Sequence, residues 1–149
     1  WLRRAKRENP GAVTVLTGCY PQAFPEEAAQ FLEADLVCGN GDRKAILDNV
    51  LKLLAAMEGK DNRRARFATV ISLLLDGKEY FFNGYVDGVI TRGQRGAEGF
   101  GYDPVFLPDG FDRTFAEMSL EEKGGISHRA RAVRAMIGFL ENYIAETKA

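Results

Sequence analysis

The 149-residue sequence has little of several features that assign a chain to a common protein class. Lysine and arginine number 20 and aspartate and glutamate 21, so neither sign of charge dominates and the net charge is −1. A protein that wraps duplex nucleic acid needs a basic face that releases counterions. We therefore expect no nucleic-acid partner, and any nucleotide chemistry should act on a small molecule.

Cysteines and long apolar runs are equally scarce. The two cysteines, Cys19 and Cys38, form neither a CxxC pair nor a disulfide framework, which indicates a cytoplasmic protein with buried or incidental thiols. No apolar run approaches the roughly 20 residues that span a bilayer, so we expect no membrane partner. The charged start does not have a signal-peptide pattern. Because the chain opens on Trp1 rather than methionine, we expect a processed product or a fragment.

The first third of the chain alternates between helical and strand-like patterns. Apolar periodicity and breaker residues predict helices at residues 2–8, 25–32 and 43–57, and strands at residues 12–17 and 34–38. This order favours a parallel α/β layer.

The remainder predicts an antiparallel hairpin and a long final helix. Residues 67–75 are almost wholly apolar, as in a strand covered on both faces, and Asp76-Gly77 joins them to a second strand at residues 78–85. A brief strand follows at residues 105–107, and Ser127 is the expected N-cap of the last helix, whose buried stripe we predict as Val133, Met136, Ile137, Leu140 and Ile144. The predicted fold class is α/β, a mixed sheet with a long antiparallel hairpin flanked by helices.

Two stretches carry residue types suited to nucleotide binding. In GFGYDP, residues 99–104, glycines flank an aromatic ring, which lets the backbone approach a flat ligand, and Asp103 can accept a hydrogen bond from a base or sugar. The alternative is a glycine-rich turn with Phe100 packed in the core. In KGGISHR, residues 123–129, the donors Lys123, His128 and Arg129 lie beside a helix start, which favours anions and carbonyl oxygens. The alternative is an ordinary solvated basic helix start.

Taken in order, these motifs resemble the inosine triphosphatase (dITP/XTP pyrophosphatase) family. The resemblance also rests on FAEM at residues 115–118, on EEK at 121–123, on FNGYVDG at 82–88, and on DNV and KLL at 48–54. It covers residues 48–149, which we predict as the base-recognition part. The resemblance implies hydrolysis of inosine and xanthosine (deoxy)triphosphates to monophosphate and pyrophosphate, with Mg²⁺ as cofactor and a homodimer as the assembly. It also implies that base and sugar contacts come from Phe100, Gly101, Tyr102, Asp103, Lys123, His128 and Arg129.

Two departures from the family pattern stand out. The family has asparagine after the lysine where this chain has Gly124 followed by Gly125, which predicts a looser loop around Lys123. The family's phosphate loop, metal-binding carboxylates and general base have no recognisable counterpart, so the catalytic residues and metal ligands are unknown. The turn GNGD at residues 39–42, with Arg43 and Lys44, imitates a phosphate loop. We favour the interpretation that it is only a strand end.

Residues 2–46 instead resemble the N-terminal domain of tRNA methylthiotransferases. The motifs NPGAV, TGCYPQ and DLVCGN carry this resemblance, within a predicted segment of residues 1–47. Cys19 matches one of several iron–sulfur ligands, and a single thiolate cannot hold a cluster, so we expect a buried strand-end thiol. The chain thus looks composite, as a gene rearrangement, a misassembly or a chimera would. The alternatives to a pyrophosphatase are a non-catalytic nucleotide-binding protein and a methylthiotransferase remnant.

Overall fold

The computed structural model describes residues 2–39, 43–97 and 101–147, and the side chains of residues 43–46 lie outside this description. Contacts divide the chain into two compact units. The first comprises residues 1–63 and 100–103, and the second residues 64–99 and 104–149. No helix among the described residues is long and apolar enough to cross a membrane.

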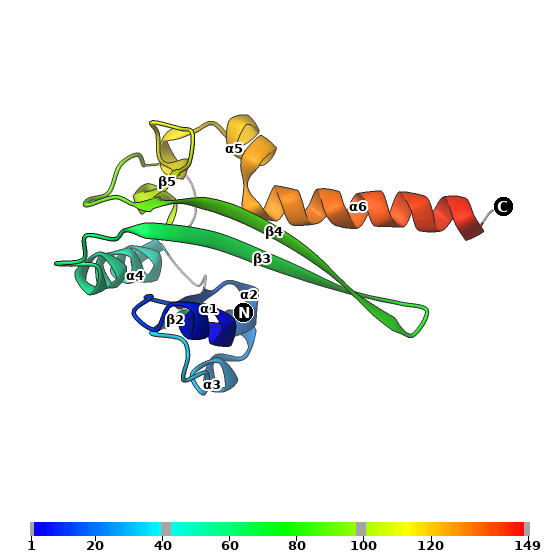
Figure 1. Ribbon diagram of the computed structural model, residues 1–149, viewed down its shortest axis with the longest axis horizontal. Helices are drawn as coiled ribbons and strands as arrows, with labels where there is room; N and C mark the ends of the chain where they lie inside the picture. Colours follow the sequence, from blue (N-terminus) through cyan, green and yellow to red (C-terminus); the bar gives the residue numbers. More distant parts are fainter. Residues whose placement is uncertain (1, 40–42, 98–100, 148–149) are drawn as a thin grey trace. The chain divides into compact units, whose positions relative to one another are not determined.

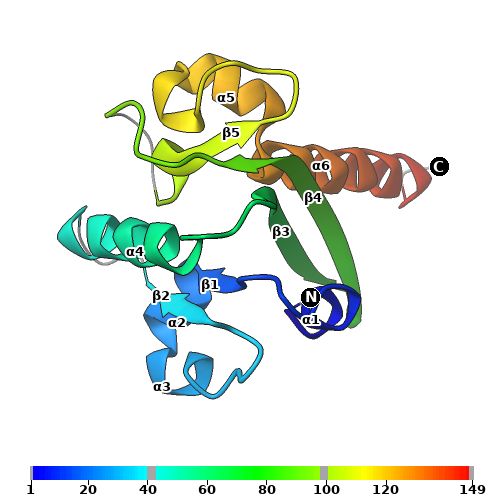
Figure 2. The ribbon, with the colours of Figure 1, turned by 60° about the vertical axis from the view of Figure 1, so that its left-hand side comes forward.

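The first unit is a small α/β layer. Its elements are α1 (Leu2–Glu8), β1 (Val15–Thr17), α2 (Cys19–Ala23), α3 (Pro25–Ala28), β2 (Leu36–Cys38) and α4 (Arg43–Ala56). β1 and β2 pair in parallel, as the alternation of helix and strand predicted. Figure 2 shows the two strands side by side, with α2 next to them and α3 next to α2.

Polar contacts join α1 to the segments that precede β1 and β2. Lys6 forms a 2.7 Å ion pair with Asp35 and donates to the carbonyl of Ala12 at 2.8 Å. The Asp35 carboxylate in turn accepts a hydrogen bond from the amide of Thr14, at 2.6 Å. One carboxylate thereby joins three segments that are separate in sequence.

Two sequence predictions in the first unit are wrong. The helix expected at residues 25–32 ends at Ala28, and the residues that follow form turns instead. Cys19 is exposed rather than buried, because it begins the short helix α2 instead of ending a strand. Cys38 is buried, as expected for a core thiol.

The second unit is a three-stranded antiparallel sheet covered by a long helix. Its elements are β3 (Arg64–Leu75), β4 (Lys78–Ile90), β5 (Phe106–Pro108), the 3₁₀ turn η2 (Phe115–Glu117), α5 (Leu120–Ile126) and α6 (His128–Thr147). The boundary between the units falls inside the 3₁₀ turn η1 (Asp103–Val105), between Asp103 and Pro104. The sheet order is β3-β4-β5. Figure 1 shows α6 running along the two long strands. Together with the parallel first unit, this confirms the mixed α/β fold with a long hairpin.

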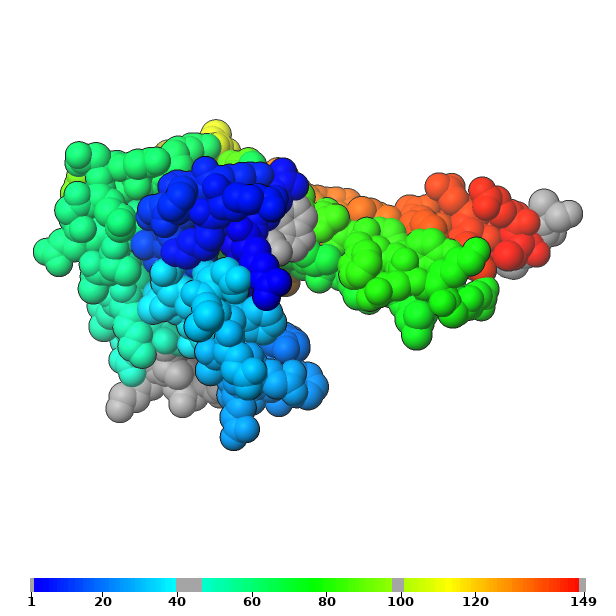
Figure 3. All heavy atoms as spheres, turned by 60° about the horizontal axis from the view of Figure 1, so that its bottom comes forward, coloured from blue at the N-terminus to red at the C-terminus, as the bar shows by residue number. Residues whose placement is uncertain are grey.

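The hairpin turn follows directly from its two residues. Leu75 pairs with Lys78, so only Asp76 and Gly77 lie between the strands, and their φ angles are +49° and +73°. Two successive positive φ values belong to the turn type whose twist matches that of paired strands. The Tyr143 hydroxyl of α6 donates a hydrogen bond to the Asp76 carboxylate. Figure 3 accordingly shows the hairpin end and the second half of α6 side by side.

The expectation that β3 is covered on both faces is wrong. Burial alternates along the whole strand, and Val70 and Leu74 are 40% and 73% exposed. An antiparallel hairpin with one helix against it has only one covered face, so alternate apolar side chains remain at the surface.

The buried stripe predicted for α6 is also partly wrong. Val133, Ile137 and Ile144 are exposed, whereas Met136 and Leu140 are half-buried. The helix instead packs through Ala132, which is fully buried, and through the ring of Phe139. That ring lies 4.5 Å from the ring of Tyr80 and 5.3 Å from that of Phe82, both on β4. Aromatic complementarity with the strand selects the buried face.

Candidate base-recognition site

The junction of α5 and α6 is built by two serine caps. Ser119 starts α5 with a reciprocal capping box, in which its hydroxyl accepts from the Glu122 amide and the Glu122 carboxylate accepts from the Ser119 amide. Ser127 ends α5, and its hydroxyl accepts a hydrogen bond from the Ala130 amide at 3.2 Å, which confirms it as the cap of α6. His128 is therefore the first residue of α6.

The loose loop expected around Lys123 is a helix. Lys123, Gly124 and Gly125 all lie within α5, and the Arg134 guanidinium of α6 donates to the Gly125 carbonyl at 2.7 Å. This contact satisfies a carbonyl at the end of α5 that the helix itself leaves unpaired. The predicted flexibility is absent because α6 caps the glycine-containing turn.

An aromatic cluster lies beneath the two buried donors. The rings of Phe67, Phe106 and Phe115 contact one another, with centroid distances of 4.3 to 6.0 Å. The His128 imidazole lies against the Phe67 ring at 4.7 Å. The Lys123 ammonium lies 5.6 Å from the Phe115 ring centre, within the range of a cation–π contact. Lys123 and His128 thus contact the same aromatic cluster.

His128 is held in its neutral form. Only 7% of the residue is exposed, and burial, followed by the positive charges of Arg129 and Lys123, lowers its pKa to about 4. Its Nδ1 atom is buried without a hydrogen-bond partner among the described residues. Such an unpaired polar atom costs about 1–3 kcal/mol, which a bound ligand could recover.

Arg129 completes the group of three predicted donors. Its side chain is exposed, and its guanidinium has no partner in the described part of the chain. Its charge acts on His128, as does that of Lys123, so the three side chains share one electrostatic environment. The second unit therefore brings together all three residues predicted from KGGISHR.

The other predicted contacts belong to the first unit. Phe100 lies outside the described residues, and Gly101 has a φ of +65°, which glycine adopts without strain. Tyr102 is buried, and its hydroxyl lies 2.9 Å from the Cys38 thiol in a hydrogen bond. Burial and then this thiol raise the pKa of Tyr102, so the phenol stays neutral. Asp103 is 2% exposed.

Several carboxylates of the second unit form structural contacts. The Thr114 amide, followed by the other contacts of this carboxyl, holds the pKa of Glu117 below its usual range, and Arg95 pairs with it at 3.2 Å. Asp87 and Asp109 are bonded by Arg66 and Arg64 at 2.7 and 2.6 Å. Among residues 2–39, 43–97 and 101–147, no three His, Cys, Asp or Glu side chains gather in a way that could hold a metal ion. We therefore assign no described residue as a Mg²⁺ ligand.

Most of the turn at residues 39–42, which imitates a phosphate loop, lies outside the described residues. Asn40, Gly41 and Asp42 are not among the described residues, and only the backbone of Arg43 and Lys44, at the start of α4, is described. The role of this turn stays a prediction.

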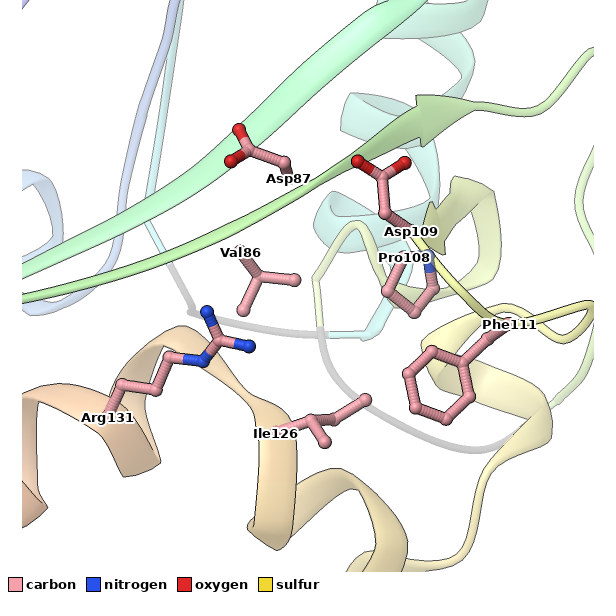
Figure 4. A pocket seen from close by; sticks show the side chains of 7 residues that line it. All are labelled: Val86, Asp87, Pro108, Asp109, Phe111, Ile126 and Arg131. Atoms are coloured by element: carbon pink, nitrogen blue, oxygen red, sulfur yellow. The ribbon is translucent and has the colours of Figure 1, made fainter.

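A cavity of about 220 Å³ lies at the edge of β4 where β5 ends (Figure 4). It contains none of the predicted site residues and is lined by Val86, Asp87, Pro108, Asp109, Phe111, Ile126 and Arg131. Its carboxylates hold the arginine pairs described above, and Arg131 donates to the Tyr85 carbonyl at 2.8 Å. Because its charged groups already have partners, the cavity is not the site that the sequence motifs predicted.

The sequence did not reveal the aromatic cluster that Lys123 and His128 contact. The sequence places Phe67 in a strand and Phe115 in a family motif, and nothing local in the sequence places Phe67 beside His128 or Phe115 beside Lys123. A usable signal existed in β4, where Gly84, Val86 and Gly88 alternate on one face. Glycines at alternate positions of a strand mark places where other groups approach its backbone closely.

Comparison with known proteins identifies the family. Residues 34–139 match the model of the Ham1 family. The chain belongs to the Ham1 family. The dITP/XTP pyrophosphatase of Flavobacterium johnsoniae is 51% identical over 100 residues, which are 67% of this chain and 52% of that protein. The structure of the Staphylococcus aureus Ham1 protein superposes with a TM-score of 0.64 at 41% identity, over 70% of this chain and 55% of that one. The resemblance that the motifs indicated is confirmed.

The extent of these matches bears on the composite interpretation. The chain spans about half the length of most of the curated Ham1 relatives that it matches. The dITP/XTP pyrophosphatase of Aquifex aeolicus is 47% identical over 143 residues, 93% of this chain and 67% of that protein, so this match extends into residues 1–47. The methylthiotransferase resemblance stays a prediction, and the relatives do not favour a methylthiotransferase remnant.

Proposed function

We propose that this Ham1 chain recognises the base of 6-oxo purine nucleotides through Lys123, His128 and Arg129. The observation that carries the proposal is the buried His128 Nδ1, which has no partner among the described residues and lies in a group flanked by two cations. The names of the relatives, dITP/XTP pyrophosphatases, support purines whose base carries a 6-oxo group.

The chemistry of these donors suits an oxo group better than an amino group. Inosine and xanthosine present an acceptor at the 6-position, where adenosine presents a donor. Lys123 and Arg129 can only donate hydrogen bonds, so an adenine amino group placed against them meets donors and finds no acceptor. Each unpaired group costs about 1–3 kcal/mol, and sites that read a polar group in this way discriminate strongly. Tyr102 and Asp103 stay predicted as base and sugar contacts.

The reaction that we propose for the intact site is hydrolysis of inosine and xanthosine (deoxy)triphosphates to monophosphate and pyrophosphate. Mg²⁺, which the family resemblance implies, would offset charge on the phosphates. Because the described residues contain no group of three potential metal ligands, we assign their carboxylates no part in that step. We infer that this chain alone binds the nucleoside end and hydrolyses triphosphate slowly or not at all, and a homodimer stays the predicted assembly.

The base-recognition proposal can be tested by calorimetry without catalysis. We expect inosine monophosphate to bind at least tenfold more tightly than adenosine monophosphate, and Arg129→Ala to reduce this ratio. Arg92→Ala, which removes another exposed arginine of the same unit, is the matched control and should leave the ratio unchanged. Equal affinity of the unmodified protein for both nucleotides would contradict the proposal.

A pyrophosphate-release assay separates an enzyme from a non-catalytic nucleotide-binding protein. The unmodified chain is incubated with inosine triphosphate and Mg²⁺, and released pyrophosphate is measured. Binding without turnover is the expected result. Turnover near the roughly 1–1000 per second common among enzymes would show that this chain supplies its own phosphate site. In that case, Arg43→Ala and Lys44→Ala would identify whether the turn before α4 provides it.

A further inference from the structure

The backbone of α6 lies directly on Gly84 of β4. A Cβ atom built at Gly84 would be 1.9 Å from the His128 carbonyl oxygen and 2.6 Å from the Ala132 nitrogen. Real Cβ atoms essentially never approach another atom within 3.0 Å. Any side chain at this position would therefore displace the first turn of α6 by about 1 Å or more.

Space, rather than an unusual backbone angle, explains the glycine. The described glycines with positive φ do not include Gly84, and its partner across the hairpin is Thr69 in regular antiparallel register. Gly88, two positions beyond Val86 on the same face, plays a similar part, because a Cβ there would be 2.3 Å from the Leu107 carbonyl oxygen and 2.8 Å from the Phe106 ring. Gly88 thus leaves room for β5 and its Phe106 ring, and Gly84 for the helix that carries His128.

The close approach sets where the imidazole lies. His128 is the residue whose carbonyl contacts Gly84, and its ring extends to within 4.7 Å of the Phe67 ring centre. Phe67 pairs with Val86, two residues along β4 from Gly84. A shift of the helix backbone by about 1 Å would therefore act on the imidazole through only a few covalent bonds, and sites of this kind tolerate little displacement.

We propose that Gly84 is a positioning residue for base recognition, which seats the start of α6 on the sheet and so fixes His128 against Phe67 and near Lys123 and Arg129. This inference rests on the proposed function for its nucleotide consequences. The placement of the imidazole can be tested without any nucleotide.

The test compares Gly84→Ala with Gly138→Ala. A Cβ at Gly138, also in α6, meets no atom within 4 Å, so this control adds the same methyl group in open space. His128 is the only histidine in the chain, so one NMR titration reports its pKa without assignment of other histidines. We expect the pKa of His128 to rise from about 4 toward 6.5 in Gly84→Ala and to stay unchanged in Gly138→Ala.

Nucleotide binding provides the second readout. Gly84→Ala should weaken inosine monophosphate binding at least tenfold, with a much smaller change for adenosine monophosphate. A folded Gly84→Ala protein with an unchanged histidine titration and an unchanged nucleotide preference would overturn the inference. If the unmodified protein shows no preference, the proposed function fails, while the titration still tests the positioning role.

A direct measurement covers the case in which Gly84→Ala does not fold. In the unmodified protein, the contact predicts a nuclear Overhauser effect between the Gly84 α-protons and the Ala132 amide proton. If this effect is observed, it supports the close contact between Gly84 and the first turn of α6. Its absence from a spectrum that shows the cross-strand effects of the neighbouring β3–β4 pairs overturns it.

Discussion

Acidification provides a stringent test of the buried histidine. In the unfolded chain His128 should titrate near 6.5, whereas in the folded protein burial and the neighbouring cations lower its pKa to about 4. Between these values the unfolded chain binds a proton that the folded protein does not. Stability therefore falls as the pH decreases from about 6.5 to about 4, and the full contribution is present above pH 6.5.

The size of the effect follows from the shift. A difference of one pKa unit corresponds to 1.36 kcal/mol, so the shift from 6.5 to about 4 corresponds to about 3 kcal/mol of stability. This is a large fraction of the roughly 5–15 kcal/mol by which domains of this kind are stable. Acidification to pH 4 should thus remove a measurable part of the stability of the second unit.

Urea unfolding followed by circular dichroism, from pH 7 to pH 4, measures this contribution. His128→Gln removes the titrating group, while the carboxylates titrate in both proteins, so the difference between the two pH profiles isolates His128. We expect the unmodified protein to lose about 3 kcal/mol more than His128→Gln over this interval. Parallel profiles, together with an NMR pKa of His128 near 6.5, would refute the burial argument.

Three further predictions test the fold. Phe139→Ala should reduce the free energy of unfolding by about 3 kcal/mol, and Ile137→Ala by less than about 0.5 kcal/mol, in urea titrations, because only the first side chain packs on β4. Cys38→Ala should cost about 1 kcal/mol more than Cys38→Ser in thermal unfolding, since serine keeps a hydrogen-bonding group for Tyr102. Gly77→Ala should cost about 1 kcal/mol in the same assay, because its φ of +73° strains an alanine. Equal costs within either pair, or no cost for Gly77→Ala, would contradict these assignments.

The hairpin and the helix caps could be predicted because their causes are local. Asp76-Gly77 fixes a two-residue turn by backbone conformation alone, and Ser127 caps α6 through an amide three residues away. The KGGISHR motif is local in the same sense, so its three donors emerge together at one helix junction.

The buried face of α6 could not be predicted, because it is determined by side chains of another element, β4. Eleven of the 20 residues of α6 are apolar, so periodicity alone allows either the stripe of Val133 and Ile137 or that of Ala132 and Phe139. The rings of Tyr80 and Phe82 on β4 decide between them. The composition of β3 likewise does not reveal that only one helix covers the hairpin.

The burial of His128 was hidden for the same reason. A lone histidine at a helix start suggests an ordinary capping residue, and the Phe67 ring that it contacts comes from a distant part of the chain. Gly84, which brings them together, has no chemistry of its own. The site is recognisable in sequence by its donors, but its affinity and pKa depend on the packing beneath them.

Burial links the acid sensitivity of the protein to the way in which it reads a base. A neutral imidazole has one nitrogen that donates and one that accepts, and a protonated imidazole has two donors. If Nδ1 donates to the 6-oxo group, protonation preserves that contact, and binding of inosine monophosphate persists or strengthens as the pH falls toward 4. If Nδ1 accepts from the base N1–H group, protonation abolishes the contact and binding weakens in the same interval. The pH dependence of binding, measured while the protein remains folded, therefore identifies which edge of the base His128 reads.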